Sequence, residues 1–98
     1  MNLIAQPVVA PALRPRLVSD RIRNRLEAAG ARYHANDNIH DFIEEVEVEL
    51  LQAEVQEKMQ EVLRALVVDV ENDHNSQDTA KRVSKMFVQE VFNCRYTE

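Results

Sequence analysis

Histidine, cysteine and closely spaced glutamate are the residue types in this sequence that could support catalysis or metal binding. The histidines are His34, His40 and His74, and the only cysteine is Cys94. His34 and His40 lie six residues apart in a polar stretch, which is not a recognised metal-ligand spacing. A single cysteine cannot supply two thiolates to a zinc site. His74 follows Asp73 in an expected exposed loop. We therefore expect no catalytic, cofactor-binding or metal-ligating residue in these 98 residues.

Seven glutamates in the middle of the chain raise the question of a carboxylate metal site. Such a site needs inward-facing acids and a histidine partner on the helices that carry them, and this stretch contains no histidine. The glutamates mostly fall off the apolar positions, which is typical of a solvated helix face. Glu54 and Lys58 are spaced to form an ion pair on that face. The seven are Glu44, Glu45, Glu47, Glu49, Glu54, Glu57 and Glu61.

Composition restricts the fold that must position these residues. Ninety-eight residues suit a single domain, and 45% hydrophobic with 30% charged residues is typical of a folded globular protein. One glycine and three prolines argue against a turn-rich all-β fold, and a lone glycine excludes a glycine-rich phosphate loop. One cysteine allows no intrachain disulfide, which fits a reducing, cytoplasmic location.

Charge is unevenly distributed, although the net charge is only −5. Residues 1–35 hold six arginines and two acids, whereas residues 36–73 hold twelve acids and two basic residues. The acidic middle repels nucleic acids and membrane surfaces, so we expect neither as a partner. A nucleic-acid binder that uses Arg14 to Arg32 is a weaker alternative, because no aromatic residue is interleaved to stack bases. The apolar start, Leu3 to Leu13, is too short and too proline-rich to span a membrane.

The hydrophobic pattern predicts an all-α fold with two to three helices. Residues 1–18 are expected to form a flexible tail, because Pro7, Pro11 and Pro15 disfavour helix. Residues 19–98 are expected to form one helical segment. Its helices are predicted at about 19–29, 43–66 and 77–92.

Local signals define the ends of the first and third helices. Ser19 or Asp20 is expected to start the first helix, and Gly30 to stop it in the left-handed conformation. Its apolar stripe is Ile22, Leu26 and Ala29. Asn75 or Ser76, or later Thr79, is expected to cap the third helix, whose stripe is Val83, Phe87 and Val91.

The central helix carries the clearest pattern in the sequence. Apolar residues recur at spacings of three and four over about five turns, close to the 3.5-residue period of coiled coils. We call this row the seam, and it predicts packing against helices of the same chain or of another subunit. The seam consists of Val48, Leu51, Val55, Met59, Val62 and Leu66.

The stretch from Glu71 to Tyr96 resembles the amino-terminal helical part of GTP cyclohydrolase I. That family carries a Thr-Pro-x-Arg-Val/Ile-Ala-Lys-Met-Tyr run, followed by an acid, an aliphatic residue, phenylalanine and glycine. The stretch from His34 to Phe42 resembles one bacterial and phage-like branch, so the resemblance spans Ser19 to Tyr96. The matching residues are Thr79, Arg82, Val83, Lys85, Met86, Phe87, Glu90, Val91 and Phe92.

The resemblance implies a parent enzyme that belongs to tetrahydrofolate and one-carbon metabolism. Members convert GTP and water to 7,8-dihydroneopterin triphosphate and formate with a zinc-activated water, and they assemble into ring-shaped homodecamers. Their zinc ligands, catalytic histidine and triphosphate-binding residues follow the matched stretch. None can be carried onto this sequence, so zinc and GTP are expected only in the full-length parent.

Two positions depart from the family pattern. Ala80 stands where many members have the proline that starts the helix, and Cys94 stands near the usual glycine. We interpret the chain as a fragment, truncated product or frameshifted remnant of such an enzyme. We expect its role to be structural and the chain to be inactive alone. We also expect it to form a homo-oligomer or to associate with full-length subunits. The alternative is a stand-alone helical interaction module that co-assembles with a full-length cyclohydrolase or regulates it.

Overall fold

A computed structural model describes residues 17–98, and within them the chain is all-helical, as predicted. The expected tail at residues 1–18 lies outside the described residues, except for Leu17 and Val18. Short 3₁₀ and π turns interrupt the α-helices. The elements are α2 (Val18–Ala28), the 3₁₀ turn η1 (His40–Phe42), α3 (Glu45–Ala65), α4 (His74–Met86), the π turn η2 (Phe87–Val91) and α5 (Asn93–Tyr96).

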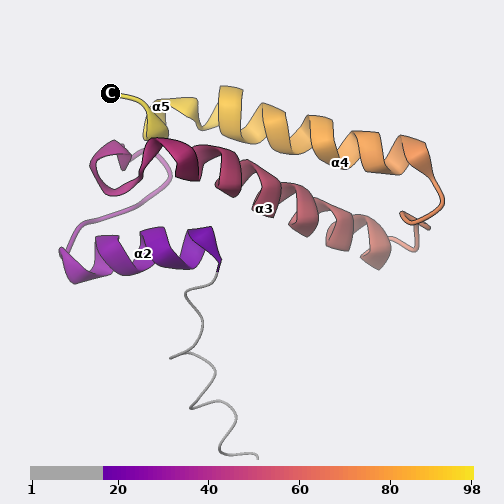
Figure 1. Ribbon diagram of the computed structural model, residues 1–98, viewed down its shortest axis with the longest axis horizontal. Coiled ribbons are helices and arrows are strands. Elements are labelled where there is room, and N and C mark those ends of the chain that lie inside the picture. Colours follow the sequence, from indigo (N-terminus) through magenta and orange to yellow (C-terminus); the bar gives the residue numbers. More distant parts are fainter. Residues whose placement is uncertain (1–16) are drawn as a thin grey trace, which may run out of the picture.

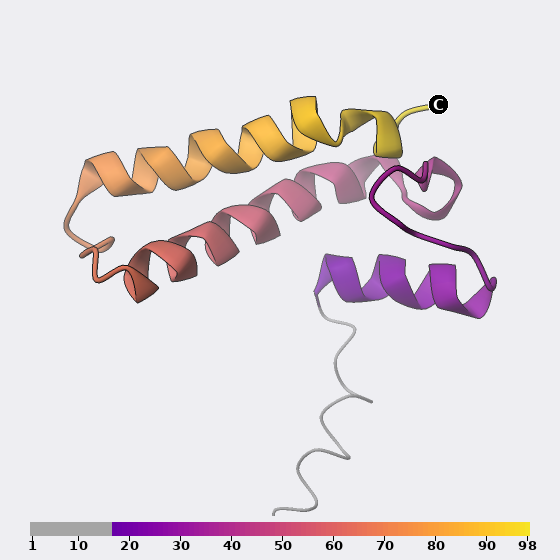
Figure 2. The same cartoon turned by 180° about the vertical axis from the view of Figure 1, so that it is seen from behind.

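Helices α3 and α4 form an antiparallel hairpin, and α2 lies along the amino-terminal half of α3 (Figure 1). The reverse view shows that the carboxyl-terminal half of α3 extends beyond α2 (Figure 2). Helix α5 returns to the start of α3, where the Ile39 N–H donates to the Arg95 carbonyl at 2.7 Å. The Asn38 amide donates to the carbonyls of Cys94 and Thr97. These bonds fix the end of α5 to the loop that precedes η1.

The core lies where α2 meets α3. Val18, Ile22 and Leu26 are buried together with Ile39, which confirms two of the three predicted stripe residues. Ala29 is the correction, because it is the exposed residue that ends the helix. The stripe instead extends backward to Val18, one residue into the predicted tail.

The amino terminus of α2 is capped from another helix. We expected Ser19 or Asp20 to provide the cap, but the helix begins at Val18 and no local side chain caps it. Instead, Glu54 of α3 accepts bonds from the N–H of Ser19, at 2.9 Å, and from its hydroxyl. A carboxylate at this position satisfies an unpaired amide and faces the positive end of the helix dipole.

Helix α4 starts earlier than predicted. We expected a start near residue 77 with a cap from Asn75, Ser76 or Thr79, but the helix begins at His74. The Asp73 carboxylate is the cap, since it accepts the Asn75 N–H at 3.1 Å and the Ser76 hydroxyl at 2.6 Å. The Thr79 hydroxyl donates to a helix carbonyl instead. These bonds lower the pKa of Asp73, the one to Ser76 most.

The small residues of α4 allow close contact with α3. Ser76, Ala80 and Ser84 recur every four residues and are buried, and Val88 in η2 continues the buried row. Ala80 is fully buried inside the helix, not at its start. A proline there would remove a helix hydrogen bond, so alanine suits this position. Beyond Met86 the helix widens into η2, where the Phe92 N–H bonds to the Phe87 carbonyl.

Candidate functional site

The residues that could do chemistry are dispersed in the structure. His34 is exposed in a loop, His74 is exposed at the start of α4, and Cys94 is exposed in α5. His40 is half-buried in η1, with its Nδ1 3.6 Å from a carboxylate oxygen of Asp41. Within residues 17–98, no three histidine, cysteine or acidic side chains come together in a group that could hold a metal ion.

Most of the seven glutamates form the solvated face that the sequence predicts, but Glu47 and Glu54 do not. Glu54 is half-buried because it caps α2. The predicted pair of Glu54 with Lys58 is therefore wrong, and Lys58 lies 3.9 Å from Glu61 instead. Glu47 is only 2% exposed.

Glu47 joins α2 to α3 through an ion pair. Arg25 donates to both of its carboxylate oxygens, at 2.6 and 2.7 Å, and also to the Phe42 carbonyl at 3.0 Å. Arg21 lies 3.7 Å from the same carboxylate, and the Glu44 N–H donates to it at 2.9 Å as part of a capping box. The hydrogen bonds from Arg25 outweigh burial and lower the pKa of Glu47 to about 2.

The other arginines near α2 are also paired with acids. Arg23 donates to Asp20 at 2.8 Å. Arg32 forms two bonds with Asp37, at 2.7 and 2.8 Å, and these lower the pKa of Asp37 to about 2. The basic face of α2 is thus largely neutralised by the protein itself, which leaves little charge to attract a polyanion.

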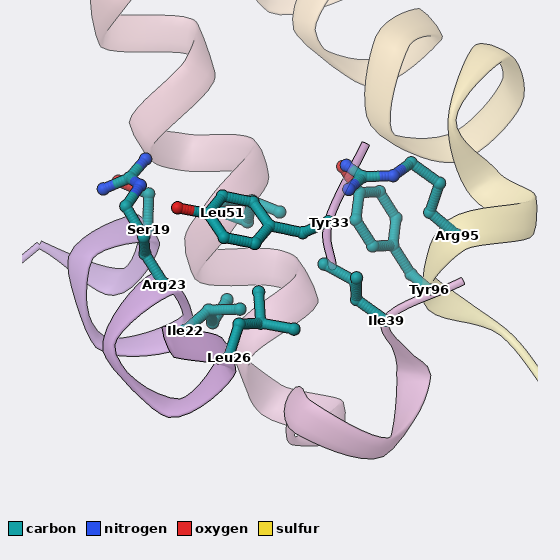
Figure 3. Close-up of a pocket in the computed structure, with 9 residues that line it drawn as sticks. All are labelled: Ser19, Ile22, Arg23, Leu26, Tyr33, Ile39, Leu51, Arg95 and Tyr96. Carbon is teal, nitrogen blue, oxygen red and sulfur yellow. The ribbon is translucent and has the colours of Figure 1, made fainter. Parts of the chain in front are cut away.

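A pocket opens between α2, α3 and α5 (Figure 3). Its cavity of about 160 Å³ has an apolar floor and a rim of tyrosines and arginines. The rim groups already have partners: Tyr33 donates to Glu27, and Arg95 donates to the carbonyls of Asp37 and His34. No histidine, cysteine or carboxylate lines the cavity, and its ionisable groups are tyrosines and arginines. The lining residues are Ser19, Ile22, Arg23, Leu26, Tyr33, Ile39, Leu51, Arg95 and Tyr96.

The seam is partly buried from Val48 to Met59 and exposed at its carboxyl-terminal end. Leu51 packs against the core under α2, and Val55 lines a hollow of about 260 Å³ together with Phe87 and Phe92. Farther along, Val62 is 49% exposed and Leu66 is 68% exposed. We call the exposed end of this row, Val62 and Leu66, the open seam. The regular spacing predicted this row, but not where its cover ends.

The residues that carry the resemblance lie along α4 and η2, between Thr79 and Phe92. Several of the apolar ones are partly exposed: Met86 is 39%, Phe87 36% and Val91 52% exposed. Phe87 and Phe92 stack with their ring centroids 6.2 Å apart, because the π turn brings residues five apart to the same face. Cys94 has a helical backbone inside α5.

Comparison with known proteins gives no relative: no family model matches the chain, and no curated protein or solved structure is significantly similar to it. Among the helices of residues 17–98, none combines the length and the apolarity needed to cross a membrane.

Proposed function

We propose that this chain is the amino-terminal helical part of a GTP cyclohydrolase I and that its role there is structural. It would pack against other parts of the enzyme and against neighbouring subunits. The observation that carries the proposal is the open seam, which presents apolar side chains without a cover among residues 17–98. The resemblance between Thr79 and Phe92 suggests the enzyme to which this surface belongs.

The energetic argument rests on exposed apolar side chains. Fully burying a valine or leucine contributes about 1.5–3 kcal/mol. Val62 and Leu66 are about half exposed or more, so burying their exposed part in an interface would stabilise the assembly by a large part of that free energy. Val62 and Leu66 lie one turn apart on α3, so their exposed areas adjoin. Contiguous apolar surface of this kind is typical of interaction sites.

In this role the chain contributes no group to the reaction. The family's chemistry needs a zinc ion with an open coordination position, and residues 17–98 contain no group of side chains suited to a metal ion. Zinc, GTP and the hydrolytic step would therefore belong to other parts of the enzyme. The stand-alone regulatory module remains the alternative, since the same open seam would serve it.

The experiment is to mix the chain with a full-length GTP cyclohydrolase I and to weigh the complexes by native mass spectrometry. We expect mixed assemblies, and we expect Leu66→Ser to weaken them. Val46→Ser is the matched control, because Val46 is 59% exposed on another face of α3. Separate masses at every mixing ratio would contradict the proposal. A changed rate of formate release in the mixed assemblies would favour the regulatory alternative.

A further inference from the structure

We propose that the pocket between α2, α3 and α5 binds a small aromatic carboxylate, with its ring on the apolar floor and its carboxylate on Arg95. The open seam takes no part in this pocket, so the inference does not depend on the proposed function. It rests on the size and lining of the cavity and on the charge of Arg95.

The pocket has room for one aromatic ring and an apolar surface to receive it. Its cavity measures about 160 Å³, and an apolar cavity of about 150 Å³ binds benzene. Tyr33 and Tyr96 also line it, and aromatic rings favour edge and offset contacts with another ring. Arg95 and Tyr96 lie across the pocket from the side chains of α2 (Figure 3). The buried side chains of the floor are Ile22, Leu26 and Ile39.

Arg95 brings to this pocket a positive charge that no acid balances among residues 17–98. Its Nε donates to the Asp37 carbonyl at 3.1 Å and its Nη2 to the His34 carbonyl at 3.4 Å, and both acceptors are uncharged. These bonds hold the half-buried guanidinium in place, so it is preorganised to receive a carboxylate. The arginines that pair with acids in this part of the chain are Arg21, Arg23, Arg25, Arg32 and Arg64.

The second arginine of the pocket provides a matched control. Arg23 donates to Asp20 at 2.8 Å, so its charge is already balanced within the chain. Arg23 and Arg95 therefore line the same cavity and differ in whether an acid accompanies them. With two guanidinium groups and no carboxylate in the lining, the pocket suits an anion better than a cation or a neutral molecule.

Titration of the full chain with sodium benzoate at constant ionic strength, followed by ¹H–¹⁵N NMR spectra, tests the proposal. We expect saturable shifts at Ile22, Leu26 and Ile39, with a Kd on the order of 1 mM for a ligand of this size. Benzyl alcohol keeps the ring without the charge and should bind about tenfold more weakly, because charge-assisted hydrogen bonds are the stronger ones. Cyclohexanecarboxylate keeps the charge without the aromatic ring and should bind about threefold more weakly.

Variants separate the two arginines. Arg95→Gln should weaken benzoate binding about tenfold, and Arg95→Lys should weaken it less, because lysine keeps the charge but not the two-pronged geometry. Arg23→Gln should leave the Kd nearly unchanged. Circular dichroism checks that each variant retains its helices. The comparison of benzoate with benzyl alcohol uses the unaltered chain, so it decides the role of charge even where Arg95→Gln does not fold.

Four results would overturn the inference. Shifts that grow linearly without saturation would mean that the pocket is not a binding site. Equal affinity for benzyl alcohol, or an equal loss in Arg95→Gln and Arg23→Gln, would remove Arg95 as the partner of the carboxylate. The largest shifts at Phe87 and Phe92 would place the ring in the neighbouring hollow instead. Binding of cyclohexanecarboxylate as tight as that of benzoate would contradict an aromatic ligand.

Discussion

At its amino-terminal end, helix α3 packs against α2 and α5 and buries a bidentate ion pair, whereas at its carboxyl-terminal end it exposes Leu66 and Val67. The carboxyl-terminal ends of α2 and α3 are both closed by a Schellman motif. Helix α2 ends with Gly30 in the left-handed conformation, with the bonds Gly30 N–H to Glu27 and Ala31 N–H to Leu26. Helix α3 ends with the equivalent bonds, but Val67 occupies the left-handed position.

The two helix ends differ in backbone strain. Glycine adopts a positive φ without strain, whereas a β-branched residue there costs about 1–3 kcal/mol. Val67 has φ +68° and is 92% exposed, so no packing contact within residues 17–98 compensates for the strain. The end of α2 is therefore formed without strain, and we propose that a partner covers the strained end of α3.

Glu47→Ala should give the largest change, because it breaks the pair that joins α2 to α3. We expect the free energy of unfolding to fall by about 2 kcal/mol, less than for a fully buried pair, because the Arg25 side chain that remains is 36% exposed and can still reach water. Equilibrium urea unfolding followed by circular dichroism measures this loss. Glu45→Ala is the control, because Glu45 is exposed in the same first turn. Equal effects of both substitutions would mean that the ion pair does not hold the two helices together.

The same carboxylate predicts an acid dependence of stability. Its folded pKa of about 2 lies below the ordinary value of 4.5, so its contribution is fully present above pH 4.5 and is lost as the pH falls toward 2. We expect a loss of about 2 kcal/mol over this range, and a smaller loss in Glu47→Gln. Urea unfolding of both proteins at about pH 5.5, above that window, and at about pH 2.5, near its lower end, makes the comparison. Identical pH profiles would contradict the assignment to Glu47.

Gly30→Ala should destabilise the end of α2. A Cβ at Gly30 would meet no atom within 4 Å, so the cost comes only from the left-handed backbone. We expect about 1 kcal/mol, which a shift of the thermal unfolding midpoint to lower temperature would report. An unchanged midpoint would show that the end of α2 relaxes without cost.

Val67→Gly should have the opposite sign at the other end. Removing the strained side chain should stabilise the chain by about 1 kcal/mol or slightly less, because glycine also gains freedom in the unfolded state. Thermal unfolding checks it, with Val68→Gly as the control at the adjacent position. A destabilised Val67→Gly protein would mean that the Val67 side chain makes a stabilising contact.

The helices were predictable because their signals are local. The stripe of Ile22 and Leu26, the stop at Gly30 and the regular seam depend on residues close in sequence. The cap of α2 by Glu54 and the burial of Glu47 were not predictable, since each partner lies on another helix. The early start of α4 was missed although Asp73 is a common cap residue, because several cap residues follow one another there.

The candidate surface was predictable only in part. Spacing alone identified the seam as apolar, but the length of α2 decides which of its residues stay exposed. The π turn that stacks Phe87 on Phe92 has no signal in the residue pattern. From the residue types we expected no chemical site in these residues. Within residues 17–98, His34, His40, His74 and Cys94 do not come together in a metal-binding group.

Amide hydrogen exchange, with and without a full-length GTP cyclohydrolase I, tests directly whether the chain assembles through the open seam. We expect slower exchange at the end of α3, from Val62 to Val70, when the enzyme is present, and little change in α2. Protection confined to α2, or no protection anywhere, would contradict the claim that the open seam is the surface through which this chain assembles.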